Sequence, residues 1–258
     1  EEYLLYTKKH SEVYGERTVV LLQCGKFYEI YGYADCTGNI VGSSIVEAAG
    51  SCDLRIAKKA QTFAFSRFTL DNLYGKESSQ YKTFHGRRFD YYMAGFQIDY
   101  IDRYVNILVQ DGWTVPVYNQ IGTSTSAMPI TRELVQVFTP GTTFSEDDVS
   151  VSNNLVCIWI TETKPNIVRP HGKIIYGCVS LDIYTGKVSV GEFEVSPVTR
   201  TISDYDDVAH FIAVEAPSEV RIIIEPSGEN GENLFKSLQR SLGPTTASHR
   251  QVEATPDV

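Results

Sequence analysis

The chain has 258 residues, 42% hydrophobic and 21% charged, and no apolar run of 18 residues, which indicates a folded protein long enough for two domains and excludes a membrane-spanning helix. Residues 1–144 carry 14 Lys and Arg against 15 Asp and Glu, whereas residues 145–258 carry 9 against 17, so most of the net charge of −9 lies in the second half. Because neutralising phosphate supplies most of the sequence-independent affinity for nucleic acid, the acidic second half is a poor candidate for such contact and the first half is the better one.

The first half alternates predicted helices and strands. The chain starts without the basic segment of a signal peptide, which favours an intracellular protein. Helices are expected at 3–14, at 43–52 and from residue 99, and strands at 18–24, 54–64, 91–96, 113–121 and 133–138. This alternation predicts an α/β domain with a mixed sheet.

The most informative segment is residues 25–32, Gly-Lys-Phe-Tyr-Glu-Ile-Tyr-Gly, which follows the strand at 18–24. On an extended chain Phe27 and Glu29 project from the same face. A ring that enters a base stack, beside an acid that accepts a hydrogen bond from a base edge, suits the recognition of a disturbed DNA duplex. The alternative is that Phe27 is a core residue of an alternating strand.

Residues 61–90 are expected to be irregular, with aromatic and basic residues interleaved. Such a mixture is typical of surfaces that bind nucleic acid, because rings stack on bases and cations contact phosphates. The alternative is a long insertion whose rings pack on the domain while its cations stay in water. In either case the best candidates for phosphate contact are Lys82, Arg87 and Arg88.

Turn-forming and charged residues at 139–154 predict a boundary between two domains, 1–144 and 145–258. In the second domain, strands are expected at 156–161, 174–182, 187–193 and 220–225, and helices at 206–216 and 230–243. A hairpin turn is expected at 184–186. Three antiparallel strands followed by helix, strand and helix is the order of an RNase H-like domain.

Two other functions are compatible with the second domain. RNase H-like folds act as metal-dependent nucleases where carboxylates converge on a divalent cation. Asp182 could be one such ligand, although Asp at this position also commonly starts a turn. A second acid would come from Glu192 or Glu194, and another from Glu215 or Glu225. Alternatively, the acidic second half is an interaction module that docks a partner protein.

The sequence contains few other signs of chemistry. The five Cys include no C-x-x-C pair, and the five His have no metal-ligand spacing. Neither a phosphate-binding G-x-x-x-x-G-K-[ST] loop nor a G-x-S-x-G motif occurs. We therefore expect reduced thiols and no cofactor in this chain.

Residues 25–29 resemble the mismatch-recognition signature of MutS proteins. Three further segments resemble family motifs in the same order, and the turn at 181–186 (LDIYTG) is similar to a hairpin of the family's connector domain. The three segments are 93–96 (MAGF), 112–122 (GWTVPVYNQIG) and 132–142 (RELVQVFTPGT). Residues 23–25 and 42–44 are most similar to the MutS homologues of giant viruses and octocoral mitochondria.

The resemblance implies a mismatch-recognition domain at 1–144 and a connector domain at 145–258. It implies that Phe27 stacks as a wedge on a mispaired base, that Glu29 hydrogen-bonds this base, and that the partner is duplex DNA with mismatches or small loops. Gln120 and Arg132 are expected to support the fold. Lys26 stands where many relatives have an acid or a small residue, and it adds a cation beside the wedge.

The resemblance also implies what lies outside this chain. The family's ATPase domain, with its ATP and Mg²⁺, and the domains through which its members form dimers are expected beyond residue 258. We therefore expect no enzyme activity in this part, a homodimer through the missing domains, and a MutL-like partner on the connector. Residues 61–90 are longer than the usual family segment, so no role is transferred to them.

Overall fold

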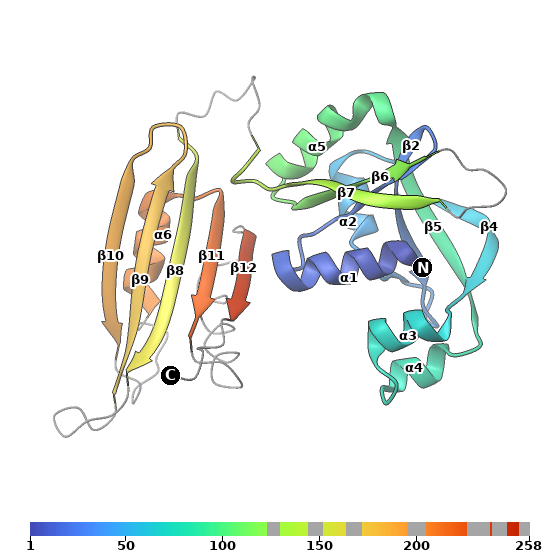
Figure 1. Ribbon diagram of the computed structural model, residues 1–258, viewed down its shortest axis with the longest axis horizontal. Helices are drawn as coiled ribbons and strands as arrows, with labels where there is room; N and C mark the ends of the chain where they lie inside the picture. Colours follow the sequence, from blue (N-terminus) through green and yellow to red (C-terminus); the bar gives the residue numbers. More distant parts are fainter. Residues whose placement is uncertain are drawn as a thin grey trace. The chain divides into compact units, whose positions relative to one another are not determined.

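The computed structural model describes residues 1–122, 130–143, 152–163, 172–195, 205–225, 238 and 247–252. The chain divides into two compact units, Glu1–Thr139 (unit 1) and Pro140–Val258 (unit 2). Both combine a mixed sheet with helices, so the predicted α/β class with mixed sheets is confirmed (Figure 1).

Within the described residues of unit 1, seven strands form a sheet of order β4-β5-β2-β1-β6-β7, and β3 pairs with β2 beside this path. Only the β1–β6 pair is parallel among the described strand pairs of this sheet, and the others are antiparallel. The strands are β1 (Leu21–Cys24), β2 (Phe27–Ala34), β3 (Ile40–Val41), β4 (Ala57–Ala64), β5 (Arg88–Gln97), β6 (Val115–Ile121) and β7 (Thr131–Phe138).

The helices of unit 1 agree with the sequence prediction outside residues 61–90. Helix α1 ends at Gly15, whose φ of 92° lies in the left-handed region that favours glycine. The 3₁₀ turn η1 leads directly into α5, which buries Val105 and Leu108. The elements are α1 (Glu2–Tyr14), α2 (Ile45–Ser51), η1 (Ile98–Tyr100) and α5 (Ile101–Gln110).

The prediction of an irregular segment at 61–90 is wrong. After β4 ends, the segment forms helices α3 (Arg67–Tyr74) and α4 (Ser79–Phe84), and β5 begins at Arg88. Each helix has an N-cap serine: Ser66 accepts from Thr69 N and Ser78 accepts from Tyr81 N. Such caps satisfy backbone donors that a short helix leaves unpaired.

Most aromatic rings of this segment pack inside unit 1. The rings of Phe63, Phe65, Phe84 and Phe89 lie 5.2 to 6.2 Å from that of Tyr33, all edge to face. Edge-to-face contacts between rings are favourable beyond the area they bury. The packing interpretation therefore holds for these four rings, while Lys82, Arg87 and Arg88 are exposed.

Unit 2 has a sheet of order β10-β9-β8-β11-β12 in its described residues. The β10–β9 and β9–β8 pairs are antiparallel, whereas β8–β11 and β11–β12 are parallel. Helix α6 (Asp206–Glu215) contributes Val208 and Ile212 to a core shared with the sheet. The strands are β8 (Asn154–Thr163), β9 (Lys173–Asp182), β10 (Val188–Val195), β11 (Glu219–Ile224) and β12 (Ala247–Val252). Strand β12 is not predicted from the sequence, and the expected helix at 230–243 lies outside the described residues apart from Leu238.

Asp182 has a structural role at the turn between β9 and β10. Its carboxylate accepts hydrogen bonds from Asn153 N (3.1 Å), Tyr184 N (3.1 Å) and Thr185 Oγ1 (2.5 Å). The bond from Thr185 comes first among the causes that lower the pKa of Asp182 below its ordinary value of 3.8. Because these bonds engage the charged form, Asp182 closes the hairpin as an ionised residue.

The acids suggested for a nuclease do not converge on Asp182. Asp182 pairs with Asn154 at one end of β8, whereas Glu192 and Glu194 lie opposite Gly177 and Ile175, further along β9. Among the residues that the structure describes, no group of three or more His, Cys, Asp or Glu could hold a metal ion.

Replacing Asp182 with Asn is expected to lower the thermal unfolding midpoint of unit 2 by several degrees at pH 7, because three donors lose a charged acceptor. A carboxylate whose pKa is lower in the folded state than in the unfolded state stabilises the fold at pH values above its unfolded-state pKa. This stabilisation is lost as the pH falls through the folded-state pKa. The difference between wild type and variant should therefore shrink below about pH 4. Thermal denaturation at several pH values measures the difference in unfolding midpoint between wild type and variant. A difference that does not depend on pH would contradict the role of the ionised Asp182 carboxylate in the turn.

Candidate nucleic-acid interface

The β1–β2 hairpin presents Phe27 at its tip. Cys24 and Phe27 pair across the hairpin, and Gly25 and Lys26 form the turn. Gly25 has a φ of 62°, a conformation that glycine adopts without the steric cost of a side chain. Lys26 O accepts from Ile98 N at 3.1 Å, which ties the turn to the end of β5. The Phe27 side chain is 44% exposed, so Phe27 is not a core residue.

Phe27 and Glu29 lie on one face of the sheet, as the strand alternation predicts. Their partners on β5 are Gln97 and Gly95, respectively. Tyr28 points to the other face, where it is buried and its hydroxyl donates to Asn119 Oδ1 at 2.6 Å. The alternation of β2 therefore separates a face with the ring and the acid from a face that packs in the core.

Gly95, which has no side chain, lies opposite Glu29 and leaves space for the Glu29 side chain. A Cβ atom at position 95 would lie 2.6 Å from Tyr28 O and 3.2 Å from Glu29 Cγ. The first distance is shorter than real Cβ contacts allow, so a larger residue would displace the strand or the acid. Gly95 is thus a condition for the observed position of Glu29.

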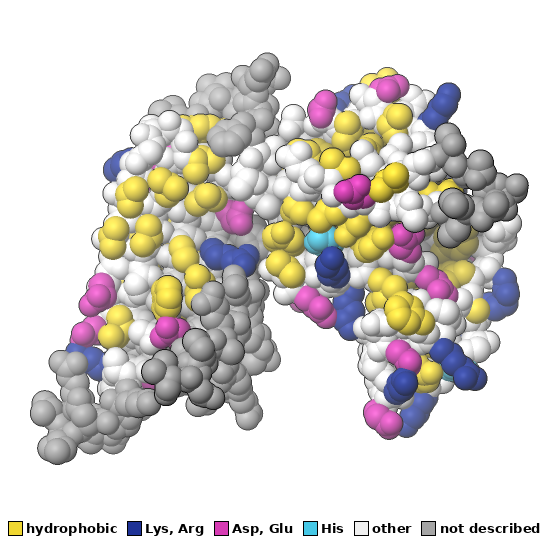
Figure 2. Space-filling model, viewed as in Figure 1, with side chains coloured by type: hydrophobic (Ala, Val, Ile, Leu, Met, Phe, Trp, Pro, Cys, Tyr) yellow, Lys and Arg dark blue, Asp and Glu magenta, His cyan; other side chains and the backbone are white. Residues whose placement is uncertain are grey.

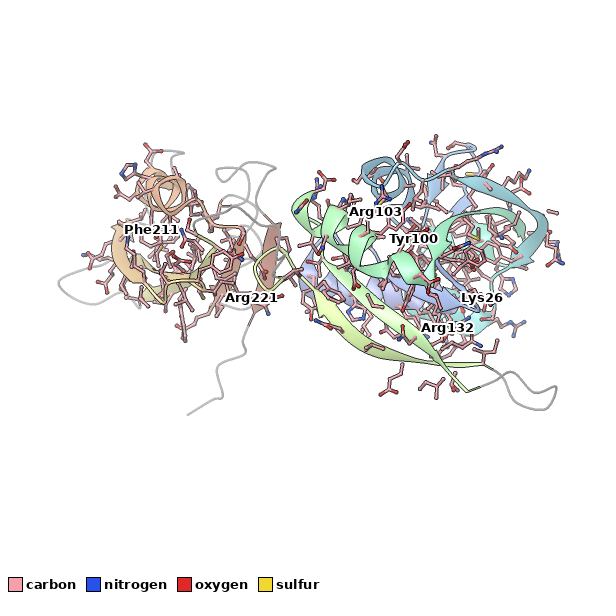
Figure 3. All side chains as sticks on the ribbon, turned by 90° about the horizontal axis from the view of Figure 1, so that it is seen from above. Lys26, Tyr100, Arg103, Arg132, Phe211 and Arg221 are labelled. Carbon is pink, nitrogen blue, oxygen red and sulfur yellow. The ribbon has the colours of Figure 1, made fainter. Side chains whose placement is uncertain are left out.

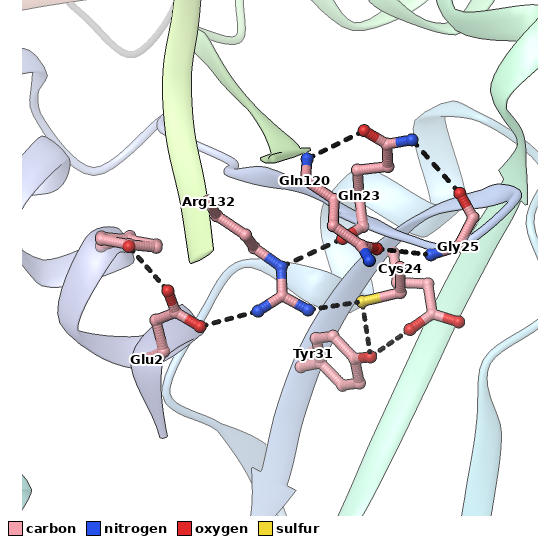
Figure 4. A network of polar contacts seen from close by, with 9 residues as sticks. Glu2, Gln23, Cys24, Gly25, Tyr31, Gln120 and Arg132 are labelled. Atoms are coloured by element: carbon pink, nitrogen blue, oxygen red, sulfur yellow. Dashed lines mark hydrogen bonds and ion pairs between the residues drawn. The ribbon is translucent and has the colours of Figure 1, made fainter. Parts of the chain in front are cut away.

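The Glu29 carboxylate is bound by Tyr31, the next residue on the same face. The Tyr31 hydroxyl donates to Glu29 Oε2, and it lies 3.5 Å from Cys24 Sγ (Figure 4). Burial raises the pKa of the Tyr31 hydroxyl, and the neighbouring Glu29 and Cys24 raise it further. The hydroxyl therefore keeps its proton and remains a donor.

Arg132 and Gln120 support the hairpin from β7 and β6. Arg132 donates from Nε to Gln23 O (3.0 Å) and from Nη1 to Glu2 Oε2 (2.8 Å), and its Nη2 lies 3.5 Å from Cys24 Sγ (Figure 4). Gln120 Oε1 accepts from Gly25 N at 3.1 Å. Gln120 N in turn donates to Gln23 Oε1 at 2.9 Å. Both side chains thus hold the hairpin in place, in agreement with the role expected from the sequence.

The predicted basic residues do not form one cluster with the wedge. Lys26 lies at the hairpin tip, whereas Lys82 is on α4 and Arg87 and Arg88 lie at the start of β5. Phe27 pairs with Gln97 at the other end of β5. A strand rises about 3.3 Å per residue, so Arg88 and the wedge are up to about 30 Å apart. Figure 2 shows Lys and Arg side chains, in dark blue, over α3 and α4.

The three candidate cations near β5 differ in their contacts. Arg88 donates to Thr62 Oγ1 (2.7 Å) and Thr62 O (2.8 Å), so its guanidinium is held against β4. Within the described residues, neither Lys82 nor Arg87 forms a side-chain ion pair, and both are exposed. Lys82 and Arg87 are thus better placed than Arg88 to contact phosphate.

Sequence reasoning did not single out Tyr100 and Arg103, which follow β5 in the chain. Tyr100 is 51% exposed, and Arg103 lies with its guanidinium carbon 5.7 Å from the Tyr104 ring centroid (Figure 3). Both follow Gln97, the strand partner of Phe27, in the chain. Tyr31 was also missed, although it shares the face of Glu29 by the same two-residue period.

A family model described as MutS domain I matches residues 65–147. The match includes Lys82, Arg87, Arg88 and Arg132, and it begins after the segment that carries Phe27. It covers α3 to β7, the part of unit 1 that pairs with and supports the hairpin.

Three curated relatives are all named as mismatch repair proteins. The mutS homolog of Acanthamoeba polyphaga mimivirus is 26% identical over 191 residues, 74% of this chain and 15% of that protein. The DNA mismatch repair protein MutS of Caldanaerobacter subterraneus is 26% identical over 129 residues (50% and 13%), and that of Fervidobacterium nodosum is 29% identical over 158 residues (61% and 16%). The chain therefore spans 13% to 16% of the length of these relatives.

Unit 1 thus combines a mixed sheet and an exposed aromatic hairpin with a match to MutS domain I. The chain is similar to proteins of the MutS family, through the domain I match and the three relatives. The mimivirus relative agrees with the similarity to giant-virus homologues expected from the sequence. In the described part of the chain, no helix is long and apolar enough to cross a membrane.

Proposed function

We propose that this chain binds mismatched duplex DNA in mismatch repair. Phe27 stacks on the mispaired base, and Glu29 accepts a hydrogen bond from it. The observation that carries the proposal is an exposed ring at the tip of a braced hairpin, with an acid on the same face. The family matches support a role in mismatch repair. Such a role places the protein on DNA inside the cell.

The chemistry of a mismatch fits these two residues. A mispaired step costs less to unstack and bend than a paired one, so the energy of deformation reports the lesion. A ring that enters the stack recovers about 1 to 3 kcal/mol. A carboxylate oxygen accepts hydrogen bonds, so Glu29 suits the N–H groups that a mispaired base leaves without a partner.

For unit 2 we propose an RNase H-like connector domain without catalytic activity. The order β10-β9-β8-β11-β12, with an antiparallel half and a parallel half, supports this fold. ATP and Mg²⁺ binding, a homodimer and a MutL-like partner are proposed for the whole protein on the family resemblance. The recognition domain is proposed to span residues 1–144 and the connector domain residues 145–258, close to the division into the two units.

One observation favours the interaction module as a second function of unit 2. The face of its sheet opposite the α6 core carries exposed apolar side chains, including Trp159, Val179 and Val190. Figure 2 shows hydrophobic side chains over β8, β9 and β10. Exposed apolar patches commonly mark protein interfaces. A MutL-like protein whose binding is lost when Trp159 and Val190 become Ser, without a change in DNA affinity, would support this function.

The primary test is fluorescence anisotropy of the full-length protein with matched and mismatched duplexes of the same length. We expect the mismatched duplex to bind roughly 5- to 150-fold more tightly, the range that stacking of one ring can supply. Equal affinity for both duplexes would overturn the proposal.

Replacing Lys82 and Arg87 with Ala is expected to weaken binding to matched and mismatched duplexes alike, because phosphate contacts carry no base information. The slope of log affinity against log salt should fall by about 1 per cation that contacts phosphate. Lys9, an exposed lysine on α1, provides the control and should change neither quantity on replacement with Ala. A salt slope unchanged by the double substitution would show that Lys82 and Arg87 do not contact DNA.

A further inference from the structure

We propose that Tyr31 is a positioning residue for Glu29: its hydroxyl fixes one oxygen of the carboxylate so that the other is presented to the mispaired base. This inference rests on the proposed function of Glu29. The hydrogen bond from Tyr31 to Glu29 Oε2 carries it. Tyr31 itself is not proposed to touch DNA.

Tyr31 is well anchored, whereas Glu29 is not. The Tyr31 ring packs edge to face on Tyr3 at 5.4 Å, contacts Tyr91 at 6.4 Å, and lines a cavity of about 350 Å³ between α1 and the sheet. Glu29 faces Gly95, which offers no side chain to hold it. A glutamate loses up to about 2 kcal/mol of rotamer entropy when it is ordered. The hydroxyl of Tyr31 orders this side chain before DNA binds, so less of that cost falls on recognition.

The Tyr31 hydroxyl keeps its proton, and its contacts connect it to the hydrogen bonds that hold the hairpin. The raised pKa of Tyr31 keeps its proton in place, so the carboxylate always meets an O–H donor. On its other side, Tyr31 contacts Cys24, which Arg132 contacts in turn. Arg132 also holds the backbone of the hairpin through Gln23 O. The orientation of the acid is therefore coupled to the same groups that fix the position of Phe27.

The bond from Tyr31 leaves the Glu29 carboxylate able to accept a further hydrogen bond from a base. An ionised carboxylate has two oxygens and about four acceptor sites, and the Tyr31 hydroxyl occupies one of them. A base N–H can approach the other oxygen without breaking this bond. A hydrogen bond to a charged group is stronger than a neutral one, so it persists beside DNA.

The test is Tyr31→Phe in the full-length protein, which removes one oxygen atom and keeps the ring. We expect the preference for mismatched over matched duplex to fall about 5- to 10-fold, while affinity for the matched duplex stays unchanged. In a Glu29→Ala background the same substitution should have no further effect, because the acid it positions is absent. A purely structural role of Tyr31 would not produce this dependence on Glu29.

Tyr28→Phe provides the matched control. Tyr28 precedes Glu29 on β2 and points to the opposite face of the sheet, where its hydroxyl donates to Asn119. Removing this hydroxyl should not change the mismatch preference. An effect of Tyr31→Phe that is equal on both duplexes, or that persists in the Glu29→Ala background, would overturn the inference. If Tyr31→Phe keeps the preference and Phe27→Ala loses it, the inference fails and the proposed function stands. If Phe27→Ala also keeps the preference, the proposed function itself fails.

Discussion

Replacing Phe27 with Ala is expected to abolish the preference for mismatched duplex. The ring is the largest exposed group at the hairpin tip, and stacking on a base contributes about 1 to 3 kcal/mol, or roughly 5- to 150-fold in affinity. Affinity for matched duplex should change little, because a well-stacked step resists entry of the ring. Anisotropy titrations with paired duplexes that differ at one base measure both quantities.

Two controls isolate the wedge from general effects. Phe68 on α3 is 69% exposed, and its replacement with Ala removes the same ring from a surface away from the hairpin. Phe68→Ala should leave the mismatch preference intact. Because Phe27 is 44% exposed, its truncation should shift the unfolding midpoint little. An equal loss of affinity for both duplexes on mutating Phe27 would count against the wedge.

Replacing Arg132 with Met is expected to lower the free energy of unfolding of unit 1 by about 2 to 4 kcal/mol. Its side chain is 13% exposed and holds Gln23 O, Glu2 and Cys24 at once. The substitution leaves the Gln23 carbonyl and the Glu2 carboxylate without this donor. Urea denaturation followed by circular dichroism gives the difference in unfolding free energy.

Arg17 offers a comparison on the same unit. It pairs with Asp111 at 3.3 Å, but both side chains are about half exposed, so Arg17→Met should cost less than about 1 kcal/mol. Arg132→Lys keeps the charge without the planar fork and should give an intermediate loss. Equal small losses for Arg132→Met and Arg17→Met would show that the hairpin does not depend on Arg132.

Much of the fold was predictable because local pattern decides it. Helix α5 follows from apolar residues at helical spacing, and the hairpin of β9 and β10 follows from a turn with Gly186 at a φ of 71°. Helices α3 and α4 were missed because they are short and because Phe65, just before α3, and Phe84 of α4 pack on Tyr33, far away in sequence. Their caps at Ser66 and Ser78 were the available signal.

The site was predictable only in part, for a related reason. The shared face of Phe27 and Glu29 follows from the period of a strand. The contacts of Arg132 join positions 108 to 130 residues apart, and no local pattern encodes them. The separation of Lys82 from the wedge depends likewise on the register of β2 and β5, which only the folded sheet reveals.

Gly95 and Glu29 face each other across two strands with no spare volume between them. A side chain gained at position 95 would meet the backbone oxygen of Tyr28 at 2.6 Å and Glu29 Cγ at 3.2 Å, so the strand that carries the acid would have to shift. The absence of a side chain at position 95 is therefore a backbone constraint on the acid for which we propose base recognition.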